Sequence, residues 1–291
     1  MPEWTIQNLL PAAAPPPLEP DRGGYTLTMR ECSGAEDVLQ RLQSSGADDP
    51  RRAHVGWGSF RNLDIAAARR SSWLLLLDVN IHQFRVWDAL RTALRDPAAT
   101  DGAAFIDLVL PLLPTQPRLR QFATSTRTWL TGDLERPGSW LFAERPERFA
   151  WVRGLFRGCR AAVGCMDLRG APGNDGDPFR SMATHMAAAA RDGFVDLDTL
   201  YVSNIPWMLA QDLGFFGESH SVYLRQGASR VLDQVHANLR AVAPAFRQVV
   251  SAAHLRPDAT SGNLQWHTEI LSPGAFLDDA YWTPLVPLTS A

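Results

Sequence analysis

The chain has 291 residues, of which 45% are hydrophobic and 20% charged, and a formal net charge of -3. This is the composition of an ordinary globular protein, which excludes a disordered or fibrous chain. The mild acidity and the scattered basic residues also argue against a nucleic-acid partner, because phosphate binding needs a clustered basic excess. All 28 basic residues are arginine, so Schiff-base lysines, lysine general bases and P-loop lysines are excluded.

Several other chemistries lack their sequence signature. The three cysteines, Cys32, Cys159 and Cys165, contain no CxxC pair, and the seven histidines show no HxH or HExxH spacing, so we expect neither a disulfide framework nor a metal site. No GxSxG elbow follows a predicted strand, which argues against a Ser-His-Asp hydrolase. The first residues lack a positive region followed by an apolar core, and we expect a cytoplasmic protein with no signal peptide and no membrane span.

The N-terminal segment is rich in proline. Residues 11–24 read PAAAPPPLEPDRGG, a composition that disfavours a helix, and residues 1–24 are predicted to form an extended arm or lid. Ser33 is a possible helix N-cap with Glu36 three positions later, which predicts a helix over 34–44. The predicted organisation is therefore an arm and helix over 1–50, followed by one α/β domain over 51–291.

Apolar runs of strand length alternate with segments of helical period along the domain. Strands are predicted at 53–58, 72–79, 159–168, 195–205 and 246–256. Helices are predicted at 62–70, 81–96, 101–114, 178–193 and 226–243. This alternation favours an α/β fold with a mainly parallel sheet and helices on both faces. Residues of about 110–160 contain no clean strand and are predicted to be a helical insertion packed over one edge of the sheet.

Candidate ligand residues lie where the predicted strands end, because ligands of open α/β sheets bind beyond the carboxyl ends of the strands. In the stretch HVGWG, Gly56 and Gly58 follow a short strand and would let the backbone approach a ligand. Asp78 ends the leucine-rich strand about twenty residues later and is followed by Val79 and Asn80. Each feature also has a structural interpretation that needs no ligand: the glycines could form a turn, and Asp78 could cap the next helix.

Polar residues also end the later strands. Asp167 lies at the end of the third predicted strand, and Ser203 and Asn204 lie at the end of the fourth, just before a proline turns the chain. His254 and Arg256 come to the same edge from the fifth strand, although a packed core histidine is the more common use of such a residue. A surface aspartate and an ordinary turn remain the structural alternatives for the third and fourth strands.

The glycine loop and the acidic strand end together resemble class I methyltransferase-fold proteins, which bind S-adenosylmethionine (SAM). The resemblance covers residues 53–258 and implies a Rossmann-like sheet. It also implies that Asp78 accepts hydrogen bonds from the ribose hydroxyls, and that Met166 and Asp167 contact the adenine ring and its amino group. The implied SAM-binding residues are Gly56, Trp57, Gly58, Asp78, Val79, Asn80, Met166, Asp167, Ser203 and Asn204.

The fourth strand end, YVSNIPW, differs from the Asn/Asp-Pro-Pro-aromatic motif of many amino-group methyltransferases. The chain is more similar to the class I proteins that transfer or cyclise the 3-amino-3-carboxypropyl arm of SAM, such as nicotianamine synthase-like enzymes and azetidine-2-carboxylate synthases. This resemblance implies an enzyme that uses SAM itself as a small-molecule substrate, without a metal, nucleic-acid or membrane partner.

For this chemistry Ser203 and Asn204 are predicted to orient the amine of SAM. Tyr201, Trp57 and Trp207 are candidates to surround the sulfonium through cation-π attraction, although plain core packing is the alternative for such aromatic residues. Two other functions stay open: transfer of the methyl group to a small molecule, and a non-catalytic module that has kept only the fold.

Overall fold

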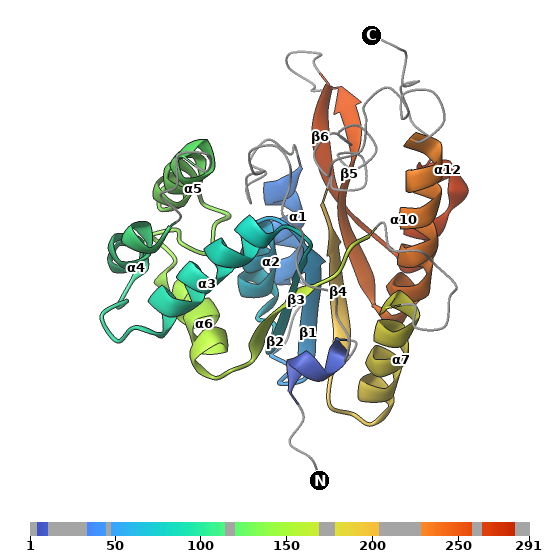
Figure 1. Cartoon of the computed structure of the whole chain (residues 1–291), viewed down its shortest axis with the longest axis horizontal. Helices are drawn as coiled ribbons and strands as arrows, with labels where there is room; N and C mark the ends of the chain where they lie inside the picture. Colours follow the sequence, from blue (N-terminus) through green and yellow to red (C-terminus); the bar gives the residue numbers. More distant parts are fainter. Residues whose placement is uncertain are drawn as a thin grey trace.

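A six-stranded sheet forms the centre of the computed structural model, which describes residues 5–10, 34–44, 48–113, 120–168, 178–203, 228–257 and 264–282. The strand order is β3-β2-β1-β4-β5-β6. Neighbouring strands from β3 to β5 are parallel, and β6 is antiparallel to β5 (Figure 1). The strands are β1 (Arg52–Trp57), β2 (Trp73–Asp78), β3 (Ala161–Cys165), β4 (Asp196–Val202), β5 (Gln248–Pro257) and β6 (Leu264–Leu271). The predicted α/β class with a mainly parallel sheet is confirmed.

Strand β2 shows why the leucine run forms an interior strand. It lies between β1 and β3, with Leu75 opposite Val55 on one side and Ala162 on the other. Its four leucines are fully buried, and they alternate between two apolar clusters on opposite faces of the sheet. A parallel strand covered on both faces needs apolar side chains at every position, so the continuous run is the expected pattern.

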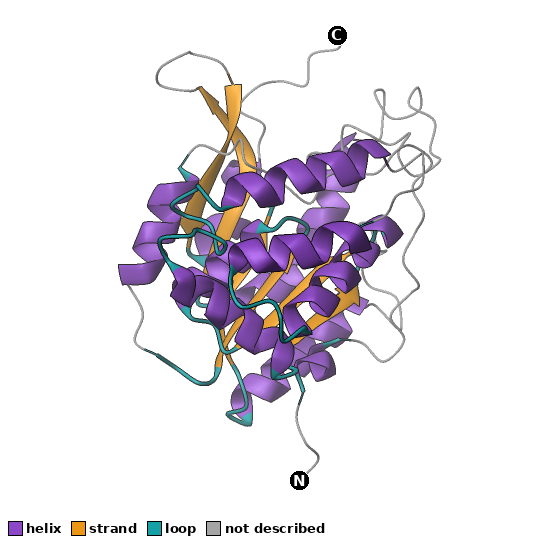
Figure 2. Ribbon diagram, turned by 90° about the vertical axis from the view of Figure 1, so that its left-hand side faces the viewer, coloured by secondary structure: helices purple, strands orange, loops and turns teal. Residues whose placement is uncertain are grey.

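Helices cover both faces of the sheet, as Figures 1 and 2 show. Leu74 and Leu76 face the cluster that contains side chains of α2, α3 and α6, whereas Leu75 and Leu77 face the cluster of α7 and α10. On the first face lie α1 (Ala35–Ser44), α2 (Arg61–Arg69), α3 (Ile81–Arg95) and α6 (Pro146–Arg157). On the second lie η1 (Ile6–Leu9), α7 (Pro178–Arg191), α10 (Ala228–Val242), η5 (Ala243–Ala245), α11 (Pro273–Leu277) and α12 (Asp279–Trp282).

The described part of the N-terminal arm belongs to the core. Ile6 and Leu9 in η1 are buried in the cluster between the sheet and α7. Leu10 packs so closely over Gly164 that a Cβ there would lie 2.5 Å from its Cδ2 atom. Residues 5–10 therefore hold the second face of the sheet, and the rest of the predicted arm or lid over residues 1–24 lies outside the described residues.

The described part of the segment between β2 and β3 consists of helices joined by turns and loops, with no strand. It contains α3, α4 (Gly102–Val109), η2 (Leu110–Leu112), α5 (Arg120–Asp133) and α6. Helix α6 packs against α2, α3 and β3, whereas α4 lies farther from the sheet against α3 (Figure 1). The sequence reading did not anticipate β6, α11 or α12. In β6, LQWHTEIL, polar residues interrupt the apolar ones, so no apolar run marks the strand.

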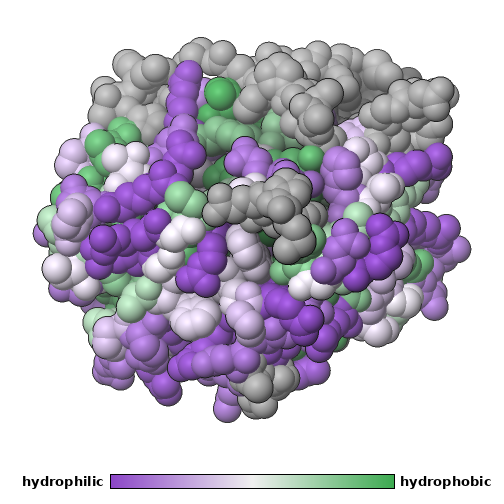
Figure 3. Space-filling model, turned by 90° about the horizontal axis from the view of Figure 1, so that it is seen from below, coloured by the Kyte–Doolittle hydropathy of each residue, from purple (hydrophilic) through white to green (hydrophobic). Residues whose placement is uncertain are grey.

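The face seen from below in Figure 3 is hydrophilic over much of its described surface, and apolar side chains are visible between the polar ones. Leu112 is the one large hydrophobic side chain that is clearly exposed among the described residues, at 46%. Within the same part of the chain, no helix has the length and apolar character needed to cross a membrane.

Candidate functional site

The ends of β1, β2 and β3 are joined by main-chain hydrogen bonds at the carboxyl edge of the sheet. The backbone nitrogen of Gly58 donates to the oxygen of Leu77 at 3.0 Å, and that of Met166 donates to the oxygen of Asp78 at 2.9 Å. Asp78 is also the register partner of Cys165. The sheet therefore brings together the glycine loop, the acidic residue and the start of the loop after β3.

Asp78 is a buried carboxylate that accepts hydrogen bonds from the described residues through one of its oxygens. Its Oδ1 accepts from the backbone nitrogens of Val79 at 2.7 Å and Asn80 at 3.0 Å. None of the described residues donates a hydrogen bond to Oδ2. Burial raises the pKa of Asp78 to about 7, although the two backbone hydrogen bonds work in the opposite direction. The site thus holds an acceptor close to its titration midpoint at neutral pH, with one oxygen left for a ligand.

The first turn of α3 adds more polar groups beside Asp78. Asn80, rather than Asp78 as the structural alternative expected, caps the helix by accepting from the backbone nitrogen of His82 at 2.9 Å. Its Nδ2 atom is buried and has no partner among the described residues. His82 and Gln83 are both buried as well. The sequence reading missed these two residues, although a polar pair directly after an acidic strand end was a usable signal.

The two glycines of HVGWG serve different purposes. Gly58 has a φ of 73°, in the left-handed region where a side chain would be strained, so it allows the turn out of β1. Gly56 is surrounded by protein: a Cβ there would lie 1.9 Å from Oδ1 of Asn62 and 2.8 Å from Cβ of Tyr201. The close approach that Gly56 permits is therefore to the protein's own side chains.

A buried histidine is connected to the glycine loop through hydrogen bonds of a neighbouring asparagine. Nδ1 of His54 lies 2.7 Å from Oγ1 of Thr199, and its Nε2 lies 3.0 Å from Oδ1 of Asn62. The Asn62 amide nitrogen donates to the main-chain oxygens of residues 57–59. Since Asn62 offers an acceptor, Nε2 of His54 carries the proton and Nδ1 accepts from the threonine hydroxyl. Burial lowers the pKa of His54 to about 4, so the ring is neutral at pH 7.

Trp57 and Tyr201 lie in the core and do not face the site. Trp57 stacks on Phe179 at 6.2 Å between ring centroids, and its Nε1 donates to the main-chain oxygen of Met166 at 3.4 Å. Tyr201 belongs to an apolar cluster beneath α1 that includes Val38. Both side chains are 1% exposed. Both side chains thus have the core packing that the structural alternative expected, and their roles around a sulfonium stay a prediction.

The remaining predicted residues are only partly described. Ser203 follows β4 directly and is buried, Met166 is buried in the core, and Asp167 is half-buried. Asn204 and Trp207, in contrast, lie outside the described residues. The side chains of His254 and Arg256 also lie outside the described set, although β5 itself pairs with β6 at these positions.

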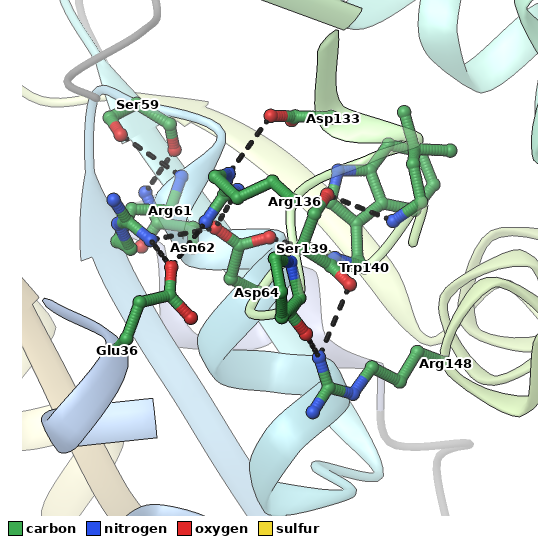
Figure 4. A network of polar contacts seen from close by, with 12 residues as sticks. Glu36, Ser59, Arg61, Asn62, Asp64, Asp133, Arg136, Ser139, Trp140 and Arg148 are labelled. Carbon is green, nitrogen blue, oxygen red and sulfur yellow. Dashed lines mark hydrogen bonds and ion pairs between the residues drawn. The ribbon is translucent and has the colours of Figure 1, made fainter. Parts of the chain in front are cut away.

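A network of charged side chains connects the helical insertion to the start of α2 (Figure 4). The buried carboxylate of Asp64 accepts from Nη2 of Arg136 at 2.7 Å, from Nη1 of Arg61 at 3.2 Å and from the backbone nitrogen of Trp140 at 2.9 Å. Arg136 also pairs with Asp133. Burial alone would lower the pKa of Arg136, but the two carboxylates outweigh it and hold the pKa above its usual value. The network fixes the segment after α5 against the helix that follows the glycine loop.

The sheet, its helices and the polar carboxyl edge define an α/β protein whose mainly parallel six-stranded sheet is compatible with a Rossmann-like fold. No protein-family model matches the chain, and no curated protein shows significant similarity to it.

Proposed function

We propose that the chain binds SAM at the carboxyl edge of the sheet, with Asp78 accepting hydrogen bonds from the ribose hydroxyls. The observation that carries this proposal is the buried Asp78 carboxylate at the end of β2, whose Oδ1 is held by the backbone while Oδ2 has no donor among the described residues. An acidic residue at this strand end is the usual partner of a ribose in nucleotide-binding sheets. A ligand hydroxyl would supply the missing donor.

The sheet topology supports a SAM-type ligand over a dinucleotide. The order β3-β2-β1-β4-β5 occurs in both kinds of protein. An antiparallel strand beside β5, as β6 is here, resembles the sheet of class I SAM-dependent methyltransferases rather than the all-parallel dinucleotide-binding sheet. This support is an analogy at the level of the fold, and the reaction has to be argued from the site.

For the reaction, we propose that the 3-amino-3-carboxypropyl arm of SAM is used, in the simplest case by cyclisation. The neutral α-amine attacks the γ-carbon of the same arm, the bond from that carbon to sulfur breaks, and its electron pair stays on sulfur. The products are azetidine-2-carboxylate, 5′-methylthioadenosine and one proton. Ser203 and Asn204 are proposed to hold the amine in line with the γ-carbon, because a strained four-membered ring requires a geometry that is rare in solution.

Incubation of the purified protein with SAM alone tests the proposal. We expect azetidine-2-carboxylate and methylthioadenosine in equal amounts, identified by mass spectrometry, at a rate proportional to protein concentration. SAM that decomposes without enzyme gives homoserine lactone instead, so a heat-denatured sample is the control. Absence of the azetidine would reject cyclisation, and absence of saturable SAM binding would reject the site itself.

Asn204→Ala separates catalysis from binding. If Asn204 orients the attacking amine, the substitution lowers kcat by about 100-fold, the scale of losing a positioning contact, with a small change in the Kd for SAM. The two constants are measured by product formation and by titration calorimetry. Equal losses in both would make Asn204 a general binding residue.

Methyl transfer to a small molecule is the second candidate, and the antiparallel β6 strand favours it equally. The same incubation distinguishes the two: a methyltransferase binds SAM but releases S-adenosylhomocysteine only when an acceptor is added. Saturable binding with no product under either condition would instead indicate a binding module.

A further inference from the structure

A second polar pocket lies on the first face of the sheet, between the end of α2 and the first turn of α6. It has a volume of about 280 Å³. Its charged lining residues are Asp48, Arg70, Arg145, Glu147 and Arg148, three arginines against two carboxylates. The pocket is at the opposite end of α2 from the glycine loop, so it is separate from the edge that carries Asp78.

Arg148 lines this pocket and is the most buried of its charged residues. Its side chain is 8% exposed, and its Nη1 donates to the main-chain oxygens of Pro137 at 2.6 Å and Ser139 at 3.3 Å. Figure 4 shows the guanidinium reaching toward this segment. Its Nε atom is buried without a partner, and no ion pair joins Arg148 to a carboxylate of the described residues. Burial accordingly lowers the pKa of Arg148, since it opposes the charged form.

A buried cation without a counter-ion is unfavourable, and an anion that enters the pocket would relieve this. The first turn of α6 lines the same pocket, and the positive end of a helix also attracts anions. The side chains at the rim of the pocket can change conformation, because they are exposed. Arg70 pairs with Asp48 at 3.2 Å and Arg145 pairs with Glu147 at 3.6 Å, and all four side chains are more than half exposed. Such surface pairs are worth only about 0–1 kcal/mol, so either arginine can turn to a ligand.

The carboxylates on the rim limit what can enter. With both acids ionised the pocket carries a small positive excess, which fits a compact oxyanion better than a highly charged chain. Trp151, Ala67 and Ala68 supply a small apolar wall beside the arginines. We propose that this pocket binds a small oxyanion, a phosphate or carboxylate group, with Arg148 as the buried anchor and Arg70 and Arg145 closing over it.

Inorganic phosphate and malonate, titrated separately into the full chain, test the site and identify the oxyanion. We expect one of them to bind with saturation in calorimetry and to raise the Tm beyond the effect of sodium chloride at equal ionic strength. Saturation by phosphate points to a phosphate ligand, and saturation by malonate alone points to a carboxylate. If neither anion exceeds the chloride control, the proposal is overturned.

Substitutions place the binding in this pocket. Arg148→Gln should weaken it by at least about tenfold, the effect of losing one charge-assisted hydrogen bond. Arg91→Gln, on an exposed i,i+3 pair of α3 outside the pocket, should leave it unchanged. The rim variants Arg70→Gln and Arg145→Gln should each weaken it about threefold, and they decide the matter if Arg148→Gln does not fold. Unchanged affinity in a folded Arg148→Gln protein, or in both rim variants, overturns the proposal, and SAM binding is unaffected by either result.

Discussion

At the scale of single residues, the buried carboxylate of Asp78 lowers the folding stability and is also the proposed contact to SAM. A carboxyl whose pKa is about 7 in the folded protein and 3.8 as a free group loses folding free energy as the pH rises between these values, because the folded state holds the proton more tightly than the unfolded state does. Buried groups that destabilise the fold are characteristic of sites shaped for a ligand. Asp78 is thus a functional candidate on physical grounds.

Asp78→Asn should raise stability while weakening SAM binding. An asparagine Oδ1 can still accept from the backbone nitrogens of Val79 and Asn80, so the turn is kept, but the buried negative charge is removed. We expect a higher Tm than wild type at pH 8, and a difference that shrinks toward pH 5 as Asp78 becomes protonated. SAM binding should weaken by about 1–3 kcal/mol, since an amide nitrogen cannot accept from a ribose hydroxyl. A lower Tm at pH 8 would contradict the destabilising role.

In the wild-type protein, the titration of Asp78 should appear in the pH dependence of SAM affinity. Only the ionised carboxylate offers acceptors on both oxygens, so SAM affinity should rise by about tenfold per pH unit up to pH 7 and then level off. Calorimetric titrations between pH 5.5 and 8.5 measure this. An affinity that does not change with pH would remove Asp78 from the binding site.

At the scale of elements, the helical insertion is attached to α2 through charge. The segment after α5 reaches Asp64 through Arg136 and the backbone of Trp140, and it also receives the guanidinium of Arg148. Gly138 contributes to this contact, because a side chain there would overlap the carboxylate of Glu36. The insertion is therefore fixed to the helix that begins at the glycine loop.

Arg136→Gln tests the attachment. Removing one partner of a buried ion pair leaves Asp64 with less compensation, and we expect a loss of about 3 kcal/mol in the free energy of unfolding. Urea denaturation of the variant, compared with Arg91→Gln on the exposed pair with Asp88, gives the measurement. The control should change stability by no more than about 0.5 kcal/mol. Equal effects in both variants would show that the network does not hold the insertion.

At the scale of the whole molecule, elements far apart in the sequence complete one core. The second apolar cluster of the sheet includes η1 near the N-terminus and α12 near the end of the described chain. Helix α1 closes a third cluster over β4 and β5. The sequence predicts a division of the chain at residue 50 into an arm with a helix and an α/β domain. In the structure, η1 and α1 from the first part pack against the sheet that the second part forms.

Leu9→Ala should therefore destabilise the whole protein. Leu9 is fully buried in the cluster shared with α7, and removing such a side chain costs about 2–5 kcal/mol. Leu112→Ala, at the exposed leucine of η2, is the matched control and should cost less than about 0.5 kcal/mol. Thermal unfolding should give a single transition in both variants. If Leu9→Ala unfolds like wild type, the arm is not part of the core.

The amino-acid sequence was sufficient to predict the class of fold, whereas the ligand site at the carboxyl edge stays a prediction. The leucine run before Asp78 could form little other than a strand buried on both faces, and the alternation of strands and helices then favoured a mainly parallel sheet. Strand β6 escaped prediction because its polar residues gave no apolar run. The helix 34–44 was visible from its cap and its period.

The packing of the residues at that edge depends on the tertiary structure. Gly56 lies against Asn62 and Tyr201, and Trp57 packs on Phe179. The burial of His54 and of Arg148 carried no signal in the sequence, because burial depends on segments distant in the chain. Periodicity is a local property of a sequence, whereas desolvation and pairing are properties of the packed molecule.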